Sequence, residues 1–262
     1  MVASLKALGL NCTLKTGGKP SSTESLMEQL FQELAKHDVE GEILRVADHD
    51  IKPGVTNDEG KGDAWPELLK KVLAADILVI DSPIWLGQPS SIAKRVLERM
   101  DAFIDQKDER GRMPSYGKVG ICAIVGNEDG AHHSAAEILS ALLEVGFTVP
   151  SGGPTYWVGE AMGSKEYKDF KTAPYVVAKW NPMLASNTAH LARLLKVANY
   201  PGIKGGRSIF FSPLKIIYLF VFLTGFFFGL FARLMPSMIN CSASRASSQR
   251  TIDTHLPFSR SL

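Results

Sequence analysis

A loop at residues 11–23 combines hydroxyl side chains with lysine, just before a stretch with helical periodicity. The residues of interest are Thr13, Lys15, Ser21, Ser22 and Thr23. At a helix N-terminus, free backbone N–H groups and the helix dipole attract an anion, and hydroxyl groups add hydrogen bonds. The loop therefore indicates a site for a phosphate monoester. The competing interpretation is that Ser21 simply caps the helix while Lys15 lies in solvent.

A second loop, at residues 81–91, offers an apolar wall for a flat ring. Trp85 and Leu86 supply apolar side chains, and Gly87 lets the backbone approach a ligand closely. The candidate ring-binding residues are Pro83, Ile84, Trp85, Leu86, Gly87 and Gln88. The competing interpretation of Trp85 is an aromatic residue of the core or of a subunit contact.

A third loop, at residues 126–133, is rich in glycine and acidic residues. Its glycines permit positive φ and expose backbone donors to a ligand. The candidates here are Gly126, Asn127, Glu128, Asp129 and Gly130. The adjacent His132 and His133 point apart on an opening helix, so we assign them to the start of that helix and predict no metal site.

Each of these loops follows an apolar run, at residues 6–10, 77–80 and 119–125. Further strands are expected at residues 42–47, 147–149 and 155–158, and helices at 22–36, 66–75, 91–105, 132–145 and within 173–197. Five alternations of strand and helix predict an α/β fold with a doubly wound parallel sheet. Loops that follow parallel strands meet at the carboxyl edge of the sheet, so the three loops predict one site.

Composition restricts the classes of function. The chain has 262 residues, and its 29 basic and 27 acidic residues leave a net charge of +2, so we expect no nucleic-acid partner. Cys12, Cys122 and Cys241 are too far apart for a CxxC metal pair or a disulfide framework. Reduced thiols and the lack of a signal-peptide pattern at the N-terminus lead us to expect a cytoplasmic protein.

The end of the chain differs from the rest, so we expect a domain at residues 1–203 and a tail at 204–262. Residues 216–232 carry no charge and would form a helix of about 26 Å, at the short limit for a membrane span. One hypothesis is a C-terminal membrane anchor. The other is a frameshifted or read-through product, because Asp253 is the only acidic residue after Arg207 and serine is frequent.

The three loops together, with residues 157–163, resemble the flavodoxin-like NAD(P)H-dependent FMN reductase family over about residues 4–200. The resemblance implies a five-stranded sheet of order 2-1-3-4-5 and bound FMN. It places Lys15, Ser22 and Thr23 at phosphate-binding positions and puts residues 83–88 and 126–130 beside the isoalloxazine. The first loop is longer than is usual in the family, with Lys15 where arginine is common. The chain lacks the compact cysteine cluster of the iron–sulfur subclass, which we exclude.

We therefore interpret the chain as an FMN-dependent oxidoreductase. NADPH or NADH would give a hydride to the flavin, which would pass electrons to a quinone or flavin acceptor. We name no catalytic residue, because the protein positions and tunes the cofactor. The resemblance also implies a homo-oligomer. The alternatives are a flavodoxin-type electron carrier without nicotinamide turnover and an interaction domain with an empty site. The near-zero charge favours the enzyme, since flavodoxins are typically acidic.

Overall fold

Five parallel strands form the central sheet of residues 4–203, which are the residues that the computed structural model describes. Their order is β2-β1-β3-β5-β6. The strands are β1 (Leu5–Asn11), β2 (Val39–Arg45), β3 (Ile77–Trp85), β5 (Val119–Gly126) and β6 (Pro154–Val158). The doubly wound parallel sheet is confirmed. The parallel strands follow the expected 2-1-3-4-5 order, and the difference is an added two-residue strand, β4 (Gln88–Pro89), antiparallel to β3.

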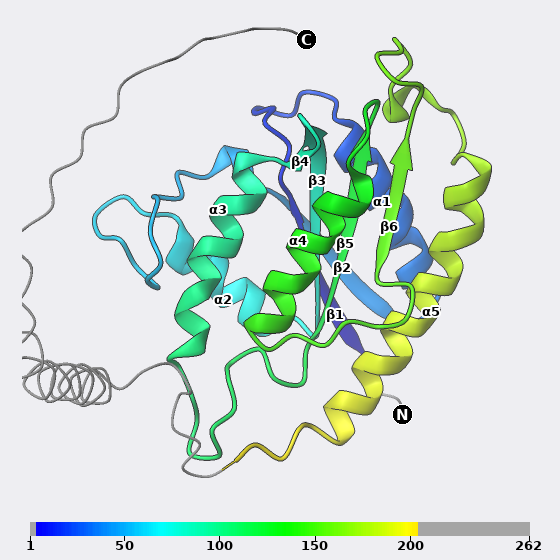
Figure 1. The fold of residues 1–262 in the computed structure, drawn as a ribbon. Helices are drawn as coiled ribbons and strands as arrows, with labels where there is room; N and C mark the ends of the chain where they lie inside the picture. The colour runs from blue at the N-terminus through cyan, green and yellow to red at the C-terminus, as the bar shows by residue number, and fades with distance from the viewer. Residues whose placement is uncertain (1–3, 204–262) are drawn as a thin grey trace, which may run out of the picture. The chain divides into compact units, whose positions relative to one another are not determined.

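Helices cover both faces of the sheet (Figure 1). The helices α1 (Ser22–Ala35) and α5 (Tyr175–Val197) lie on one face, and α2 (Trp65–Ala74), α3 (Ser91–Met100) and α4 (Ala131–Glu144) lie on the other. Short 3-10 turns are η1 (Val46–Asp48), η2 (Asp101–Ile104) and η3 (Tyr167–Asp169). Because successive residues of a strand point to opposite faces, Val79 packs beneath α1 and α5 while Ile80 packs beneath the other three helices. Burial on both faces explains the continuous apolar runs in the sequence.

The second loop is largely a β-hairpin. The strand expected at residues 77–80 continues to Trp85, and β4 turns back so that Ile84 pairs with Pro89 and Trp85 with Gln88. Leu86 and Gly87 form the turn with φ values of 53° and 75°. Two positive φ values match the twist of a tight hairpin. The prediction ended the strand too early because it took the polar residues Asp81 and Ser82 as the start of a loop.

The fifth strand is shorter than expected. Residues 154–158 form β6, whereas residues 147–149 contribute only one isolated bridge, between Val119 and Thr148. A turn with glycines at positions 152 and 153 separates the two segments.

A buried ion pair fixes the long loop between η1 and α2. The guanidinium of Arg99, on α3, lies 2.7 Å from a carboxylate oxygen of Asp63, and both side chains are fully buried. The same guanidinium donates to the carbonyl groups of Lys52 and Thr56. The loop begins beside the first loop, because Asp48 accepts a hydrogen bond from the backbone of Gly17. The loop has no regular secondary structure, but hydrogen bonds and the buried ion pair fix its position.

Within residues 4–203, every helix is too short or too polar to cross a membrane. The predicted span at residues 216–232 lies outside the described part of the chain, as does the rest of the tail. The anchor and read-through hypotheses therefore both stay predictions.

Candidate functional site

A cavity of about 570 Å³ lies at the carboxyl edge of the sheet, where the loops after β1, β3 and β5 meet. A volume of this size is typical of small-molecule sites. Most of the predicted residues line it, and they are Thr13, Lys15, Ser21, Ser22, Thr23, Pro83, Ile84, Trp85, Leu86, Gly126, Asn127 and Glu128. The single site expected from the three loops is therefore present as one cavity with contributions from each.

One end of the cavity is formed by the first loop and the start of α1. Ser21 is the N-cap residue, but its hydroxyl makes no capping hydrogen bond and instead contacts the hydroxyl of Thr23. The ammonium group of Lys15 donates to the carbonyl of Pro20 at 3.2 Å. The hydroxyl of Ser21 therefore does not cap α1, whereas Lys15, whose side chain is 44% exposed, stays partly in solvent. We call this end, defined by Lys15, Ser22 and Thr23, the phosphate end.

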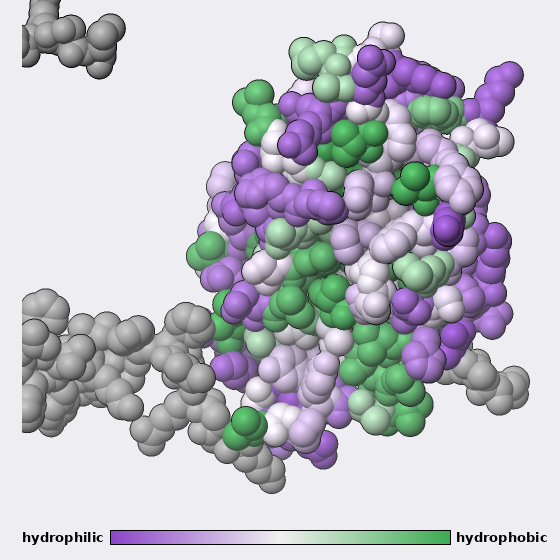
Figure 2. Space-filling view, turned by 45° about the vertical axis from the view of Figure 1, so that its right-hand side comes forward, coloured by the Kyte–Doolittle hydropathy of each residue, from purple (hydrophilic) through white to green (hydrophobic). Residues whose placement is uncertain are grey.

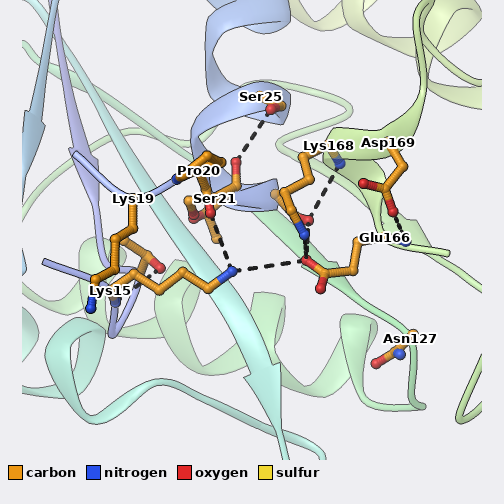
Figure 3. A network of polar contacts seen from close by, with 12 residues as sticks. Lys15, Lys19, Pro20, Ser21, Ser25, Asn127, Glu166, Lys168 and Asp169 are labelled. Carbon is orange, nitrogen blue, oxygen red and sulfur yellow. Dashed lines mark hydrogen bonds and ion pairs between the residues drawn. The ribbon is translucent and has the colours of Figure 1, made fainter. Parts of the chain in front are cut away.

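An acidic side chain that the sequence reasoning missed closes the phosphate end. Glu166, just before η3, accepts a hydrogen bond from the hydroxyl of Ser22 at 3.3 Å and lies 3.9 Å from the ammonium of Lys15 (Figure 3). The ammonium of Lys168 also donates to the same carboxylate oxygen. The hydrogen bond from Lys168 is the main cause that lowers the pKa of Glu166, and the charges of Lys15 and Lys168 add to it. An ionised carboxylate thus already lies among the donors predicted for a phosphate.

The opposite end of the cavity is apolar and open to solvent. We call it the ring end and define it by Pro83, Ile84, Trp85 and Leu86. Trp85 is 55% exposed and Leu86 is 90% exposed, so the interpretation of Trp85 as a core residue is wrong for this chain on its own. Figure 2 shows hydrophobic residues near the upper edge of the molecule as separate patches among hydrophilic residues, and not as one continuous patch. The ring end therefore presents an apolar rim.

Hydrogen bonds join the loops around the ring end. The backbone N–H of Leu86 donates to the carboxylate of Glu128 at 2.8 Å, which links the hairpin to the third loop. The third loop is joined in turn to the segment after β6. The side-chain amide of Asn127 donates to the carbonyl of Gly163 at 2.8 Å, and the backbone carbonyl of Asn127 accepts from the backbone N–H of Met162 at 3.0 Å. These links set the shape of the ring end largely through the backbone.

Four predicted residues, Gly87, Gln88, Asp129 and Gly130, hold the loops together instead of lining the cavity. A Cβ added at Gly130 would lie 2.6 Å from the Cα of Gly87, so this contact requires a glycine. The side chain of Gln88 bonds to His133 at 3.0 Å, and His132 and His133 lie in the first turn of α4 as expected. These residues support the site from outside.

Other lining residues were not predicted, namely Leu14, Val125, Trp157, Met162, Glu166 and Tyr167. The resemblance of residues 157–163 to the family's late loop was a usable signal for Trp157 and Met162. Tyr167 packs against Trp157, with ring centroids 5.4 Å apart, and its hydroxyl donates to Gln29 on α1. No pattern in the sequence pointed to Glu166 or Tyr167, because they lie in an irregular segment after the last strand.

A buried carboxyl group lies beside the phosphate end. Asp81 pairs with Asn11 across β3 and β1, and Asn11 accepts a hydrogen bond from the backbone of Thr13. Asp81 is fully buried, and its two carboxyl oxygens have no hydrogen-bond partner among the described residues. Burial raises the pKa of Asp81 well above its usual range. Burial, with a smaller contribution from Asp81, also raises the pKa of Cys12 and Cys122. Both are free thiols in the core, as expected.

Comparison with known proteins adds to this geometry. The model of a family described as NADPH-dependent FMN reductase matches residues 5–162. An 8-demethyl-8-aminoriboflavin-5'-phosphate synthase of Streptomyces davaonensis is 35% identical over 207 residues, which cover 75% of this chain and 80% of that protein. The divalent metal cation transporter MntH of Mycobacterium bovis is 41% identical over 169 residues. Those residues are 63% of this chain but only 25% of the transporter, so the chain spans about a quarter of that relative.

A solved structure is similar over nearly the whole chain. It is the crystal structure of RosB with a bound intermediate, 8-demethyl-8-formylriboflavin-5'-phosphate. The TM-score is 0.69 at 29% sequence identity, and the match covers 98% of this chain and 96% of that one. A flavone reductase structure, at 18% identity and a TM-score of 0.52, shares the fold.

Proposed function

This chain belongs to the NADPH-dependent FMN reductase family, and we propose that it takes a hydride from NADPH or NADH and passes electrons to a small quinone or flavin acceptor. Family membership brings FMN as the cofactor and the reduced nicotinamide as the electron donor. One observation carries the proposal: a single cavity joins hydroxyl and ammonium donors at the start of α1 to an apolar, partly open ring end.

The residues of the cavity fit FMN. An anion is already accommodated at the phosphate end, where the carboxylate of Glu166 takes a hydrogen bond from Ser22. We assign the phosphate to Lys15, Ser22 and Thr23, with Thr13 and Ser21 supporting that loop. The ring would lie along residues 83–86, with residues 126–128 on its other side. When bound, FMN supplies the hydride and electron chemistry.

The protein's contribution is to bind FMN, to orient its ring and to leave the ring accessible to a second molecule. The hydrogen bond from Leu86 to Glu128 keeps the hairpin and the third loop at a fixed separation. The exposed Trp85 and Leu86 border an opening through which a second small molecule can approach the ring end. We assign no proton transfer to a side chain, and we name no catalytic residue.

The decisive experiment measures bound flavin and turnover on one preparation. The protein is loaded with FMN, and oxidation of NADPH and of NADH is followed with and without an added quinone. We expect turnover that depends on both FMN and the acceptor. Bound FMN without nicotinamide oxidation would favour the flavodoxin-type electron carrier. A protein that binds no flavin would favour the interaction domain with an empty site.

A second candidate function treats the flavin phosphate as the substrate. It is favoured by the 35% identity to an 8-demethyl-8-aminoriboflavin-5'-phosphate synthase and by the similarity to RosB with its bound flavin intermediate. Mass spectrometry of FMN recovered after aerobic incubation tests it. Unchanged FMN mass together with rapid NAD(P)H oxidation supports the reductase, whereas a modified flavin supports the second candidate.

The remaining features are proposals about the setting of this domain. We propose that the domain ends at residue 203 and that the protein is cytoplasmic. We also propose that it forms a homo-oligomer, which the exposed apolar rim at Trp85 and Leu86 supports. Light scattering behind a sizing column measures the mass directly. A monomer at micromolar concentration would contradict the oligomer.

A further inference from the structure

The carboxylate of Glu166 shares its partners with the proposed phosphate. Its oxygen accepts from the hydroxyl of Ser22 at 3.3 Å, lies 3.9 Å from the ammonium of Lys15 and accepts from the ammonium of Lys168 (Figure 3). Ser22 is the first residue of α1, where the backbone and the dipole favour negative charge. One carboxylate therefore uses the same helix end, hydroxyl and lysine that we assign to the ligand.

A phosphate dianion and an ionised carboxylate cannot occupy these positions together. Two ammonium groups, those of Lys15 and Lys168, face the single negative charge of Glu166. Adding a dianion while Glu166 stays would leave an excess of negative charge among groups in direct contact. Repulsion between the phosphate and a carboxylate that share the same hydrogen-bond partners would strongly oppose binding. Binding of a phosphate therefore requires the carboxylate to withdraw.

The surroundings of Glu166 allow that withdrawal. Its side chain is 44% exposed, so solvent is available on one side. The segment itself is held by other contacts, since the backbone N–H of Glu166 donates to Asp169 at 2.9 Å and the hydroxyl of Tyr167 donates to Gln29. A rotation of the Glu166 side chain would free the Ser22 hydroxyl and the Lys168 ammonium. It would also break the hydrogen bond that this side chain accepts from the backbone of Asp169 in the capping box of η3, while the bonds from the Glu166 backbone to Asp169 and from Tyr167 to Gln29 would remain.

We infer that Glu166 is a placeholder for the ligand's phosphate, and that its displacement by phosphate delivers Lys168 as a second phosphate-binding cation beside Lys15. This inference rests on the proposed function, because it takes FMN as the ligand. Glu166 lowers affinity for every phosphate-bearing ligand and leaves riboflavin unaffected. It thereby acts as a specificity-determining residue that only a strongly charged phosphate displaces.

The experiment compares binding of FMN and riboflavin by quenching of flavin fluorescence. Glu166→Gln keeps the shape and removes the charge, so the Kd for FMN should fall about tenfold while that for riboflavin stays within about twofold. Lys168→Met should raise the Kd for FMN about tenfold and leave riboflavin unchanged. Glu160→Gln is the matched control, because Glu160 is an exposed carboxylate in the same segment, and it should change neither constant.

A second readout uses inorganic phosphate alone. Millimolar phosphate should raise the melting temperature of the Glu166→Gln variant more than that of the wild type. If Glu166→Gln does not fold, Glu166→Asp replaces it. Aspartate retains the charge but withdraws it from Ser22 by one methylene, so this variant should also bind FMN more tightly than the wild type.

The outcomes separate the inference from the proposed function. Unchanged or weaker FMN binding by Glu166→Gln, in a protein whose wild type binds FMN, would overturn the inference and make Glu166 an anchor for Lys168. If the wild type bound neither FMN nor riboflavin, the proposed function would fail together with the inference.

Discussion

The two ends of the cavity differ in the chemical groups that form them. The phosphate end is charged and hydroxyl-rich, and its side chains bond to one another through Glu166. The ring end is apolar at its surface, with Trp85 and Leu86 exposed, and its loops are joined mainly by backbone groups. At one end side chains must exchange partners when a ligand arrives, whereas at the other the backbone frame is already in place.

This difference assigns separate duties to the two ends. Binding at the phosphate end depends on charge, so it should be sensitive to salt and should distinguish FMN from riboflavin. Binding at the ring end depends on apolar contact, so it should be the same for both ligands. Substitutions at the two ends should therefore give different patterns across the ligand pair, and the following predictions test that separation.

The largest effect is expected from Ser22→Ala combined with Thr23→Ala. Each hydrogen bond to a charged group is worth about 1.5–3 kcal/mol, so the Kd for FMN should rise roughly 100-fold. Riboflavin, which lacks the phosphate, should lose less than about threefold. Isothermal titration with both ligands measures this. Ser25→Ala is the control on the same helix, since Ser25 bonds to Ser21 and does not line the cavity. An equal loss for both ligands would break the division between the ends.

A smaller effect with the opposite pattern is expected at the ring end. Trp85→Ala should weaken FMN and riboflavin alike by about tenfold and shift the flavin absorbance, because an aromatic contact is removed. Trp180→Ala is the control, since Trp180 is also a partly exposed tryptophan but does not line the cavity. Unchanged flavin binding and spectrum together with a change in oligomer mass would assign Trp85 to a subunit contact instead.

The third prediction concerns stability beside the phosphate end. The raised pKa of Asp81 means that the folded protein holds its proton more tightly than the unfolded chain. This stabilising contribution is complete below the unfolded pKa of about 3.9 and is lost as the pH rises through the folded value. Asp81→Asn removes the titration, so the variant should be more stable than the wild type at pH 8, by about 1 kcal/mol or more.

The advantage of Asp81→Asn should shrink as the pH falls towards 4, which urea unfolding at several pH values measures. Asp105→Asn, at an exposed position, is the control. A constant difference between Asp81→Asn and wild type at all pH values would mean that Asp81 does not titrate as its burial implies.

The smallest effect on chemistry is expected from deleting residues 208–262. All residues that line the cavity precede position 168, so affinities at both ends and turnover should stay within about twofold. Cell fractionation of the full and shortened chains tests the tail itself. Full-length protein found only in the supernatant would contradict a membrane anchor, and loss of FMN from the shortened chain would contradict a self-sufficient domain.

The sequence predicted the sheet and most of the cavity for a geometric reason. Parallel strands bring the loops after residues 10, 80 and 125 to one edge whatever their distance in the chain. Contacts between loops were less predictable. Gly87 and Gly130 look like ligand-binding glycines, but the structure uses them to bring two backbones together. Composition alone does not distinguish a glycine that faces a ligand from one that faces another loop.

The acidic member of the phosphate end was beyond sequence reasoning. Glu166 lies in an irregular segment after β6, and only the packing of Tyr167 against Trp157 and α1 brings it to Ser22. The Arg99–Asp63 pair was equally hard to predict from the sequence. A charged residue on a helix is usually exposed to solvent, and only the structure shows that the loop between η1 and α2 buries Arg99. Both the position of Glu166 and the Arg99–Asp63 pair depend on contacts between segments that are distant in the chain. Local sequence patterns carry no information about such contacts.

The contact between Ser22 and Glu166 also has a consequence for the order of folding. The two residues are 144 positions apart, and the Gln29–Tyr167 contact spans 138. Closing such long loops costs entropy that no local structure offsets, so these contacts should form after the β1–β3–β5 sheet. The same segment should be the first to open in native-state hydrogen exchange, by local unfolding well below the global free energy.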